Sequence, residues 1–207
     1  KNMSRKQIAQ ELLCDFAASG DTFLNSVELD YVMSTTQTPI EKWGPDAGVW
    51  VWKYALQDHR YIIAADVARG DSADFSTCHV IDSNSGEQVC EFKGKIPPDQ
   101  FAILLSEIGS RYNKALLCPE NNGYGYAVCM KLKEIGYQNL YYKDKKYQLL
   151  GAAAGSEEIA NIGFTTGPSN RTKILTKLEE VIRNKQIKLK STRTYDELKT
   201  FTWVGQT

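Results

Sequence analysis

The pattern of hydrophobic and polar positions changes along the chain, and each change marks a predicted element. Residues 4–16 place Ile8, Leu12 and Phe16 at a spacing of four behind a serine that can cap a helix, which predicts a short amphipathic helix. Residues 17–58 contain several glycines and prolines among three tryptophans. They predict a connector packed on a larger body.

From residue 61 the pattern becomes typical of strands. The run YIIAADVA at 61–68 is apolar at consecutive positions, which predicts a strand buried on both faces. Residues 76–96 predict a hairpin, because the Asp, Ser, Asn and Gly residues at 82–86 favour a turn. Residues 115–122 predict a fourth buried strand, and residues 140–142 predict a short fifth one.

Three helical patterns alternate with the later strands. The first opens at Pro97–Asp99 and should bury Phe101, Leu104, Leu105, Ile108 and Tyr112. The second covers 125–136 and ends at a glycine. After a Gly- and Ala-rich loop at 151–167, residues 170–186 predict a long helix that buries Ile174, Leu178, Val181 and Ile182. The order predicts an α/β fold with three antiparallel strands, further parallel strands and flanking helices.

Length and charge set limits on function. The chain has 207 residues, 42% of them hydrophobic, which suffices for one sizeable core and at most a small second unit. Its 25 basic and 25 acidic residues cancel, and that argues against coating nucleic acid through bulk charge. The cancellation hides a division: residues 1–130 carry 11 basic and 17 acidic groups, whereas residues 131–207 carry 14 and 8. The second part therefore suits a phosphate-bearing partner.

Cysteine usage and hydropathy indicate the compartment. Five cysteines without a CxxC pair, and only two histidines, argue against a zinc site and favour buried reduced thiols in a cytosolic protein. No apolar stretch approaches the roughly 20 residues of a membrane span, and residues 1–16 lack the apolar core of a signal peptide. We therefore expect no membrane partner.

Two carboxylates end buried strands. Asp66 lies at the end of the first strand and Glu120 at the end of the fourth. Ligands of open α/β sheets collect at these carboxyl ends. A carboxylate buried without a partner costs several kcal/mol, so a shared divalent cation is the economical explanation. Carboxylate oxygens suit Mg²⁺ or Mn²⁺, and two such ions about 4 Å apart can promote phosphodiester hydrolysis.

The segments after these acids add further ligand candidates. Asp74 is a tentative third metal ligand, because the chain returns there into the second strand, whereas Asp71 beside a glycine reads as a solvated turn residue. Residues 121–125, NNGYG, lead into a helix N-terminus whose backbone donors could contact a phosphate. Neither GxxxxGK[ST] nor GxGxxG occurs, which argues against nucleotide sites of those types.

Other polar groups admit two interpretations. Cys118 and His79 could act as nucleophile and base, but both lie in apolar strand runs without an orienting third group. Four basic residues are tentative DNA contacts, or equally the solvated groups of a loop and of a helix face: Lys143, Lys145, Lys146 and Arg171. Three tyrosines between 141 and 147 could stack on bases there.

Four stretches together resemble one family. They are IAQELLCDF at 8–16, YIIAADVARGDSADFST at 61–77, LLCPENNGYGYAV at 116–128 and RTYDELKTFTW at 193–203. They closely resemble the C-terminal nuclease domain of the large terminase subunit of tailed bacteriophages, over nearly the whole chain. The resemblance implies a ribonuclease H-like fold and an endonuclease that cuts concatemeric viral DNA during packaging, with divalent metal held by three acids. The first two acids map to Asp66 and Glu120.

The third acid of the family has no match. It usually sits on a helix after the segment that resembles YDELKTFTW, and Asp196 is the nearest substitute in this sequence. We therefore expect a nuclease domain at 59–207 that is truncated at its C-terminus and cuts weakly. Residues 1–58 would lead from an ATPase domain that is absent here. The implied partners are double-stranded DNA, the portal and the small terminase subunit, in the cytoplasm of the infected bacterial host.

Three rival functions stay open. Another ribonuclease H-like nuclease, such as a junction resolvase, would prefer branched DNA. An actin-like ATPase begins with a similar strand and hairpin, but its strand end carries Asp-x-Gly, whereas Val67 and Ala68 follow Asp66 here. A non-catalytic docking module of the packaging motor would bind partners without binding metal.

Overall fold

The computed structural model describes residues 22–71, 73–144, 146 and 155–202, which fall into two compact units. One unit is the continuous stretch Pro39–Arg171. The other is built from both flanking parts of the chain, of which residues 22–38 and 172–202 are described. No helix in these described ranges is long and apolar enough to cross a membrane.

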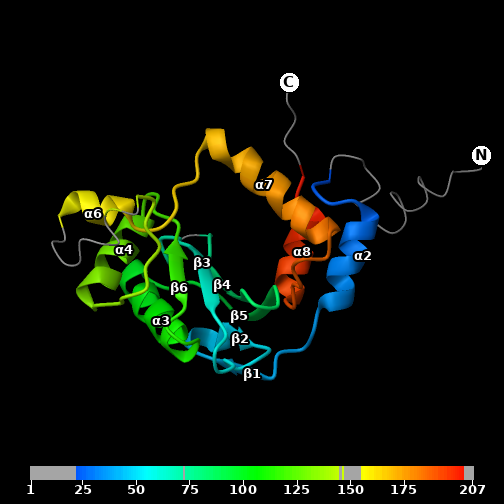
Figure 1. Cartoon of the computed structure of the whole chain (residues 1–207), viewed down its shortest axis with the longest axis horizontal. Helices are drawn as coiled ribbons and strands as arrows, with labels where there is room; N and C mark the ends of the chain where they lie inside the picture. The colour runs from blue at the N-terminus through cyan, green and yellow to red at the C-terminus, as the bar shows by residue number, and fades with distance from the viewer. Residues whose placement is uncertain (1–21, 72, 145, 147–154, 203–207) are drawn as a thin grey trace, which may run out of the picture. The chain divides into compact units, whose positions relative to one another are not determined.

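A six-stranded sheet forms the continuous unit (Figure 1). Its order is β1-β2-β5-β4-β3-β6, and every neighbouring pair is antiparallel except β3 and β6, which run parallel. The predicted mixed sheet is therefore confirmed. The strands are β1 (Glu41–Trp43), β2 (Val49–Val51), β3 (Tyr61–Asp66), β4 (Ser76–Asp82), β5 (Glu87–Gly94) and β6 (Leu116–Pro119).

The segment predicted as a connector contains regular structure. Residues 26–35 form helix α2 (Ser26–Thr35), and a short hairpin of β1 and β2, joined through the 3₁₀ turn η2 (Pro45–Ala47), extends the sheet beside β5. Val49 and Val51 of β2 are 0% and 4% exposed. Strands of three residues are too short to show alternation, and their partner lies about 40 positions away along the chain. Residues 4–16, predicted to be helical, lie outside the described ranges.

Helices cover one face of the sheet. The helices α3 (Pro98–Arg111) and α4 (Gly125–Glu134) share a hydrophobic core with the strands, and α6 (Ser156–Asn161) contributes Ile159 to it (Figure 1). The residues predicted to face inward on α3 are buried, and the Phe92 and Phe101 rings lie 5.5 Å apart. In place of the short fifth strand there are two isolated bridges, a parallel one from Leu140 to Leu117 and an antiparallel one from Tyr142 to Ile162.

The opposite face of β3 is open to solvent, which contradicts the prediction of burial on both faces. Tyr61, Ile63 and Ala65 are buried, whereas the alternate residues of the strand are exposed, Ile62 to 39%. Side chains of a strand alternate between faces, and only the Ile63 face meets the core. Alanine at positions 64 and 65 obscures this alternation in the sequence.

The second unit has its own core. α2, α7 (Pro168–Arg183) and α8 (Thr192–Thr200) contribute to it, and the two flanking chain segments are joined by the Phe23 N–H, which donates to the Phe201 carbonyl at 2.9 Å. Ile182 is 1% exposed, as predicted, but Ile174 is 41% exposed. Leu175 takes the inward position instead, because it shares a helix face with Leu178 and Ile182.

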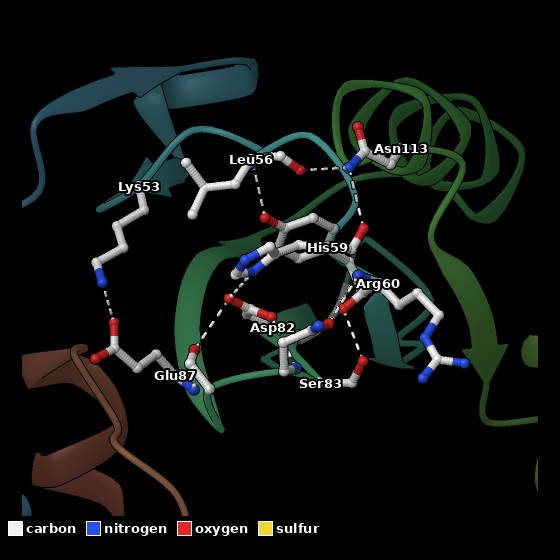
Figure 2. Close-up of polar contacts among 11 residues, drawn as sticks. Lys53, Leu56, His59, Arg60, Asp82, Ser83, Glu87 and Asn113 are labelled. Carbon is white, nitrogen blue, oxygen red and sulfur yellow. Dashed lines mark hydrogen bonds and ion pairs between the residues drawn. The ribbon is translucent and has the colours of Figure 1, made fainter.

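A polar network closes the end of the sheet where β3 begins (Figure 2). Asp82, 3% exposed, accepts hydrogen bonds from His59 Nδ1 at 2.8 Å, the Asn84 N–H at 2.9 Å and the Ser85 hydroxyl at 3.0 Å. Asn113 Nδ2 donates to the Leu56 and His59 carbonyls. Burial alone would raise the pKa of Asp82, but the hydrogen bonds outweigh it and lower the pKa. The loop before β3 is thereby fixed to the β4–β5 turn.

We predict that Asp82→Asn lowers the free energy of unfolding by about 1–3 kcal/mol near pH 7, since it weakens this set of hydrogen bonds. The folded-state pKa lies below the unfolded value of about 3.9, so the stabilisation is present above that value and is lost as pH falls through the folded pKa. Urea titrations should show a larger loss at pH 7 than at pH 3. The control is Asp58→Asn, at an exposed position with φ of 66° that asparagine tolerates. Equal losses at both pH values would contradict the assignment.

Gly109 in α3 offers a test of core packing. Alanine is favoured over glycine in a helix by about 1 kcal/mol, but a Cβ at position 109 would lie 2.2 Å from the Tyr137 hydroxyl oxygen. We expect Gly109→Ala to destabilise the protein by about 1–3 kcal/mol. Adding Tyr137→Phe, which removes that oxygen, should recover part of the loss. A gain in melting temperature on Gly109→Ala would contradict the packing; Ser110→Ala, at the exposed next position, is the control.

Candidate active site

The parallel pairing of β3 with β6 brings two acids together. Ala65 is paired with Pro119, and the Glu120 N–H donates to the Ala65 carbonyl at 2.7 Å. The next residue on each strand is an acid, and the carboxyl group of Glu120 lies close enough to that of Asp66 to raise the pKa of Asp66. The sequence-based prediction that both lie at one edge of the sheet agrees with this geometry.

The segment after β6 holds Glu120 in place. Asn122 Nδ2 donates to Glu120 Oε1 at 3.0 Å and to the Thr166 carbonyl at 2.9 Å. A Cβ at Gly125 would lie 1.8 Å from the Glu120 carbonyl oxygen, so no larger residue fits there. The first N–H groups of α4 already donate to carbonyls of residues 122–124. The NNGYG segment therefore positions the acid, a role that the sequence analysis missed in favour of phosphate contacts.

The electrostatics of Asp66 are those of a carboxylate that lacks a compensating cation. The residue as a whole is exposed, but its carboxyl group has lost hydration, and this raises its pKa. The neighbouring carboxyl group of Glu120 and the charge of Asp74 raise the pKa further, and the hydrogen bond from the Val67 N–H lowers it. Two carboxylates this close repel each other. A divalent cation between them could offset that repulsion.

A pocket of about 370 Å³ opens beside Asp66. Asp74, Phe75 and Tyr124 line it, together with residues 67–69. Phe75 is 44% and Tyr124 is 48% exposed. Neither aromatic residue was predicted from the sequence. The available signals were that Phe75 directly follows Asp74 and that Tyr124 lies in the segment after Glu120.

The two acids that follow Asp66 along the chain have different surroundings. Asp74 lines the pocket and acts electrostatically on Asp66, whereas Asp71 is exposed and forms an ion pair with Arg69 at 3.0 Å. Asp196 lies on α8 in the other unit.

The donor chemistry fits a divalent metal, although a complete ligand set is not assembled. Asp66, Glu120 and Asp74 supply only carboxylate oxygens, which hard cations such as Mg²⁺ and Mn²⁺ prefer. Across residues 22–71, 73–144, 146 and 155–202, no three His, Cys, Asp or Glu side chains are arranged to hold a metal ion. Two acids in contact therefore form the core of the candidate site.

The basic residues predicted to contact DNA lie elsewhere. Lys143 Nζ donates to Thr165 Oγ1 at 3.0 Å, and Lys146 Nζ pairs with Asp144 at 3.4 Å. Arg171 is an exposed residue of α7. Lys145 falls outside the described residues. The pocket lining includes none of the three described residues.

Cys118 and His79 do not form a nucleophile and base. Both pair with Ala64, from opposite sides, so two strand spacings of about 4.8 Å separate them. Burial raises the pKa of the Cys118 thiol to about 11, the direction opposite to activation. His79 Nδ1 instead lies 2.7 Å from Gln88 Nε2.

Comparison with known proteins identifies relatives by structure alone. No protein-family model matches the sequence, and no curated protein matches it. The large terminase nuclease from thermophilic phage G20c with bound magnesium superposes with a TM-score of 0.66 at 18% identity, over 90% of this chain and 84% of that chain. The same nuclease with bound cobalt gives 0.65 at 18% identity over the same shares.

A second phage nuclease is similar. The Thermus phage P74-26 large terminase nuclease domain gives a TM-score of 0.57 at 18% identity, over 83% of this chain and 76% of that chain. Together with the mixed sheet and its flanking helices, these matches define the architecture. The chain has the ribonuclease H-like fold of phage large terminase nuclease domains.

Proposed function

We propose that this chain is a metal-dependent DNA endonuclease of the phage large terminase type. The observation that carries the proposal is the pair of neighbouring acids Asp66 and Glu120, with a raised pKa on Asp66, at the carboxyl edge of the sheet. The structurally similar G20c nuclease has been crystallised with magnesium, cobalt and zinc. Metal dependence of this chain follows by analogy of fold and by the chemistry of its two acids.

Each residue has a distinct role in the proposed site. Asp66 and Glu120 would hold Mg²⁺ or Mn²⁺, with Asp74 as the third oxygen donor, and Asn122 orients Glu120. When bound, the metal supplies positive charge that activates water and stabilises the departing oxygen of a phosphodiester. Tyr124 and Phe75 line the pocket that the substrate strand would enter.

We also propose the biological setting from the same resemblance. The substrate would be double-stranded viral DNA, cut during packaging in the cytoplasm of an infected bacterium. An ATPase domain of the same polypeptide, the portal and the small terminase subunit would be the partners. Lys143, Lys145, Lys146 and Arg171 stay proposed as contacts to the DNA backbone outside the pocket.

The nuclease proposal predicts loss of cutting when either acid is neutralised. The chain should nick supercoiled plasmid in the presence of Mn²⁺, and Asp66→Asn or Glu120→Gln should reduce the rate at least about 100-fold, because each removes a charge from the metal site. Asp74→Asn should reduce the rate if that residue completes the ligand set. Gel assays of nicked product over time provide the measurement.

The matched control is Asp71→Asn, which neutralises a nearby acid that pairs with Arg69 instead. It should cut like the parent. Equal cutting by Asp66→Asn and the parent would refute the assignment of the site. Preference for branched over linear DNA would favour the resolvase alternative, and retention of partner binding without any metal binding would favour a docking module.

Metal-free stability provides a second test of the acid pair. Because the folded-state pKa of Asp66 is raised, its ionised form destabilises the folded protein. Asp66→Asn should therefore raise the melting temperature of the metal-free protein by about 1–2 °C, as the carboxylates are partly solvated and their repulsion is worth under about 1 kcal/mol.

The gain in melting temperature on Asp66→Asn should depend on pH. Below about pH 4 Asp66 is protonated in both states and the gain should vanish. The gain should grow as pH rises from there and level off above the raised pKa of Asp66. Mn²⁺ should raise the melting temperature of the parent and not that of Asp66→Asn. An equal response of both proteins to Mn²⁺ would place the metal elsewhere.

A further inference from the structure

A row of side chains at the carboxyl edge continues past the acids to a lysine. Asp66 of β3 pairs with Thr77 of β4, and Thr77 pairs with Lys93 of β5. Directly opposite residues of neighbouring strands project from the same face, so Lys93 stands on the face that carries Asp66. With strands about 4.8 Å apart, their Cα atoms are about 10 Å apart. This lysine therefore shares a surface with the acid pair.

A second lysine, Lys95, lies with Lys93 beside the Phe75 ring. The Nζ atoms of Lys93 and Lys95 lie 5.1 Å and 5.3 Å from the centroid of the Phe75 ring. Both distances fall in the range of a cation–π interaction. Residues 93 and 95 are two positions apart in an extended segment, so their side chains leave the same side of the chain. Two ammonium groups thus lie within about 10 Å of each other, around a ring that lines the Asp66 pocket.

The loop that carries Phe75 is tied down beside these lysines. The Ala68 N–H donates to Ser76 Oγ at 3.0 Å, which fastens the start of the loop to β4. Gly70 has a φ of +95°, and a Cβ there would lie 2.5 Å from the Ile96 carbonyl oxygen. The loop backbone therefore packs against the residue that follows Lys95. These contacts hold the backbone on both sides of the Phe75 ring and the two lysines.

The charges at this edge need an anion of a particular kind. Two ammonium groups beside one ring can both donate to the non-bridging oxygens of a phosphate. The acids in the adjacent pocket would repel a small free anion as well. A DNA strand differs, because it can place one phosphate at the metal-loaded acids while the next phosphate reaches the lysines.

We propose that Phe75, Lys93 and Lys95 form a phosphate clamp that binds the DNA backbone next to the scissile phosphate. Lys93 and Lys95 contact non-bridging phosphate oxygens, and Phe75 is a positioning residue that orients the two ammonium groups. This proposal rests on the proposed nuclease function, since it requires that DNA enters the Asp66 pocket. The phosphate clamp would contact the DNA backbone closer to the scissile phosphate than the lysines near residue 143.

Salt dependence of DNA binding tests the phosphate clamp without cutting. Fluorescence anisotropy with a labelled duplex in Ca²⁺, a hard cation that carboxylates bind, between 50 and 250 mM salt, gives the slope of log affinity against log salt concentration. The Lys93→Gln/Lys95→Gln double variant should reduce the magnitude of that slope by about 2 and weaken binding roughly tenfold at low salt. The matched control is Lys42→Gln, because Lys42 also lies over an aromatic ring, Trp50, at 4.2 Å, but on the edge strand β1.

Variants of Phe75 separate positioning from folding. Phe75→Leu keeps an apolar side chain but loses the ring face, and should weaken DNA binding a few-fold. Phe75→Tyr should restore parental affinity. Melting temperatures of all variants near that of the parent show that folding is intact.

The outcomes distinguish the two proposals. A double variant with the parental slope, or a parent without salt-dependent binding, would overturn the phosphate clamp even if the parent nicks DNA. A slope that depends on the two lysines, in a parent that does not nick DNA with Mn²⁺, would support the phosphate clamp as a DNA site and refute the nuclease. Equal slope changes in Lys42→Gln and the double variant would also overturn the phosphate clamp.

Discussion

Two carboxyl groups held side by side by the pairing of parallel strands are the constraint around which the sheet unit is arranged. The backbone contact of Glu120 with Ala65, the glycine at position 125 and the amide of Asn122 all hold the pair together despite its repulsion. Two buried acids among the described residues have polar partners. Asp82 accepts three hydrogen bonds, and Glu158 lies 2.7 Å from Lys133 Nζ. At Asp66 burial and the neighbouring acids raise the pKa, and the hydrogen bond from the Val67 N–H lowers it. Two acids held together in this way form a site suited to a cation.

The spatial distribution of charge differs from its distribution along the chain. The count by sequence assigned the acidic character to residues 1–130 and the phosphate-binding character to the remainder. Lys93 and Lys95 belong to the acidic part by number, yet the fold places their ammonium groups around Phe75, which lines the Asp66 pocket. Charge complementarity toward a polyanion is therefore built locally, between neighbouring strands.

Local patterns predicted most of the elements, and pairing between distant segments explains what they missed. Asp66 and Glu120 were predictable because strand-end acids are visible one strand at a time. The hairpin of β1 and β2 was missed, because three-residue strands show no period and gain their burial from β5. Lys93 and Asp66 share a row because of the register of β3, β4 and β5. That register could not be predicted from one sequence. The inward side of the helix at 168–183 was predicted with one residue misplaced, since Ile174 and Leu175 are equally apolar.

The division of the chain has a consequence for how the molecule is made. The sheet unit is one uninterrupted stretch, whereas the second unit joins residues 22–38 to residues 172–202 through contacts such as Phe23 with Phe201. During synthesis on the ribosome, the sheet with both acids can form as soon as residue 171 has emerged. α2 is translated before the sheet, yet its apolar face with Leu29 and Val32 must wait for α7 and the segment to Leu189. The earliest part of the described chain is therefore among the last to find its packing partners.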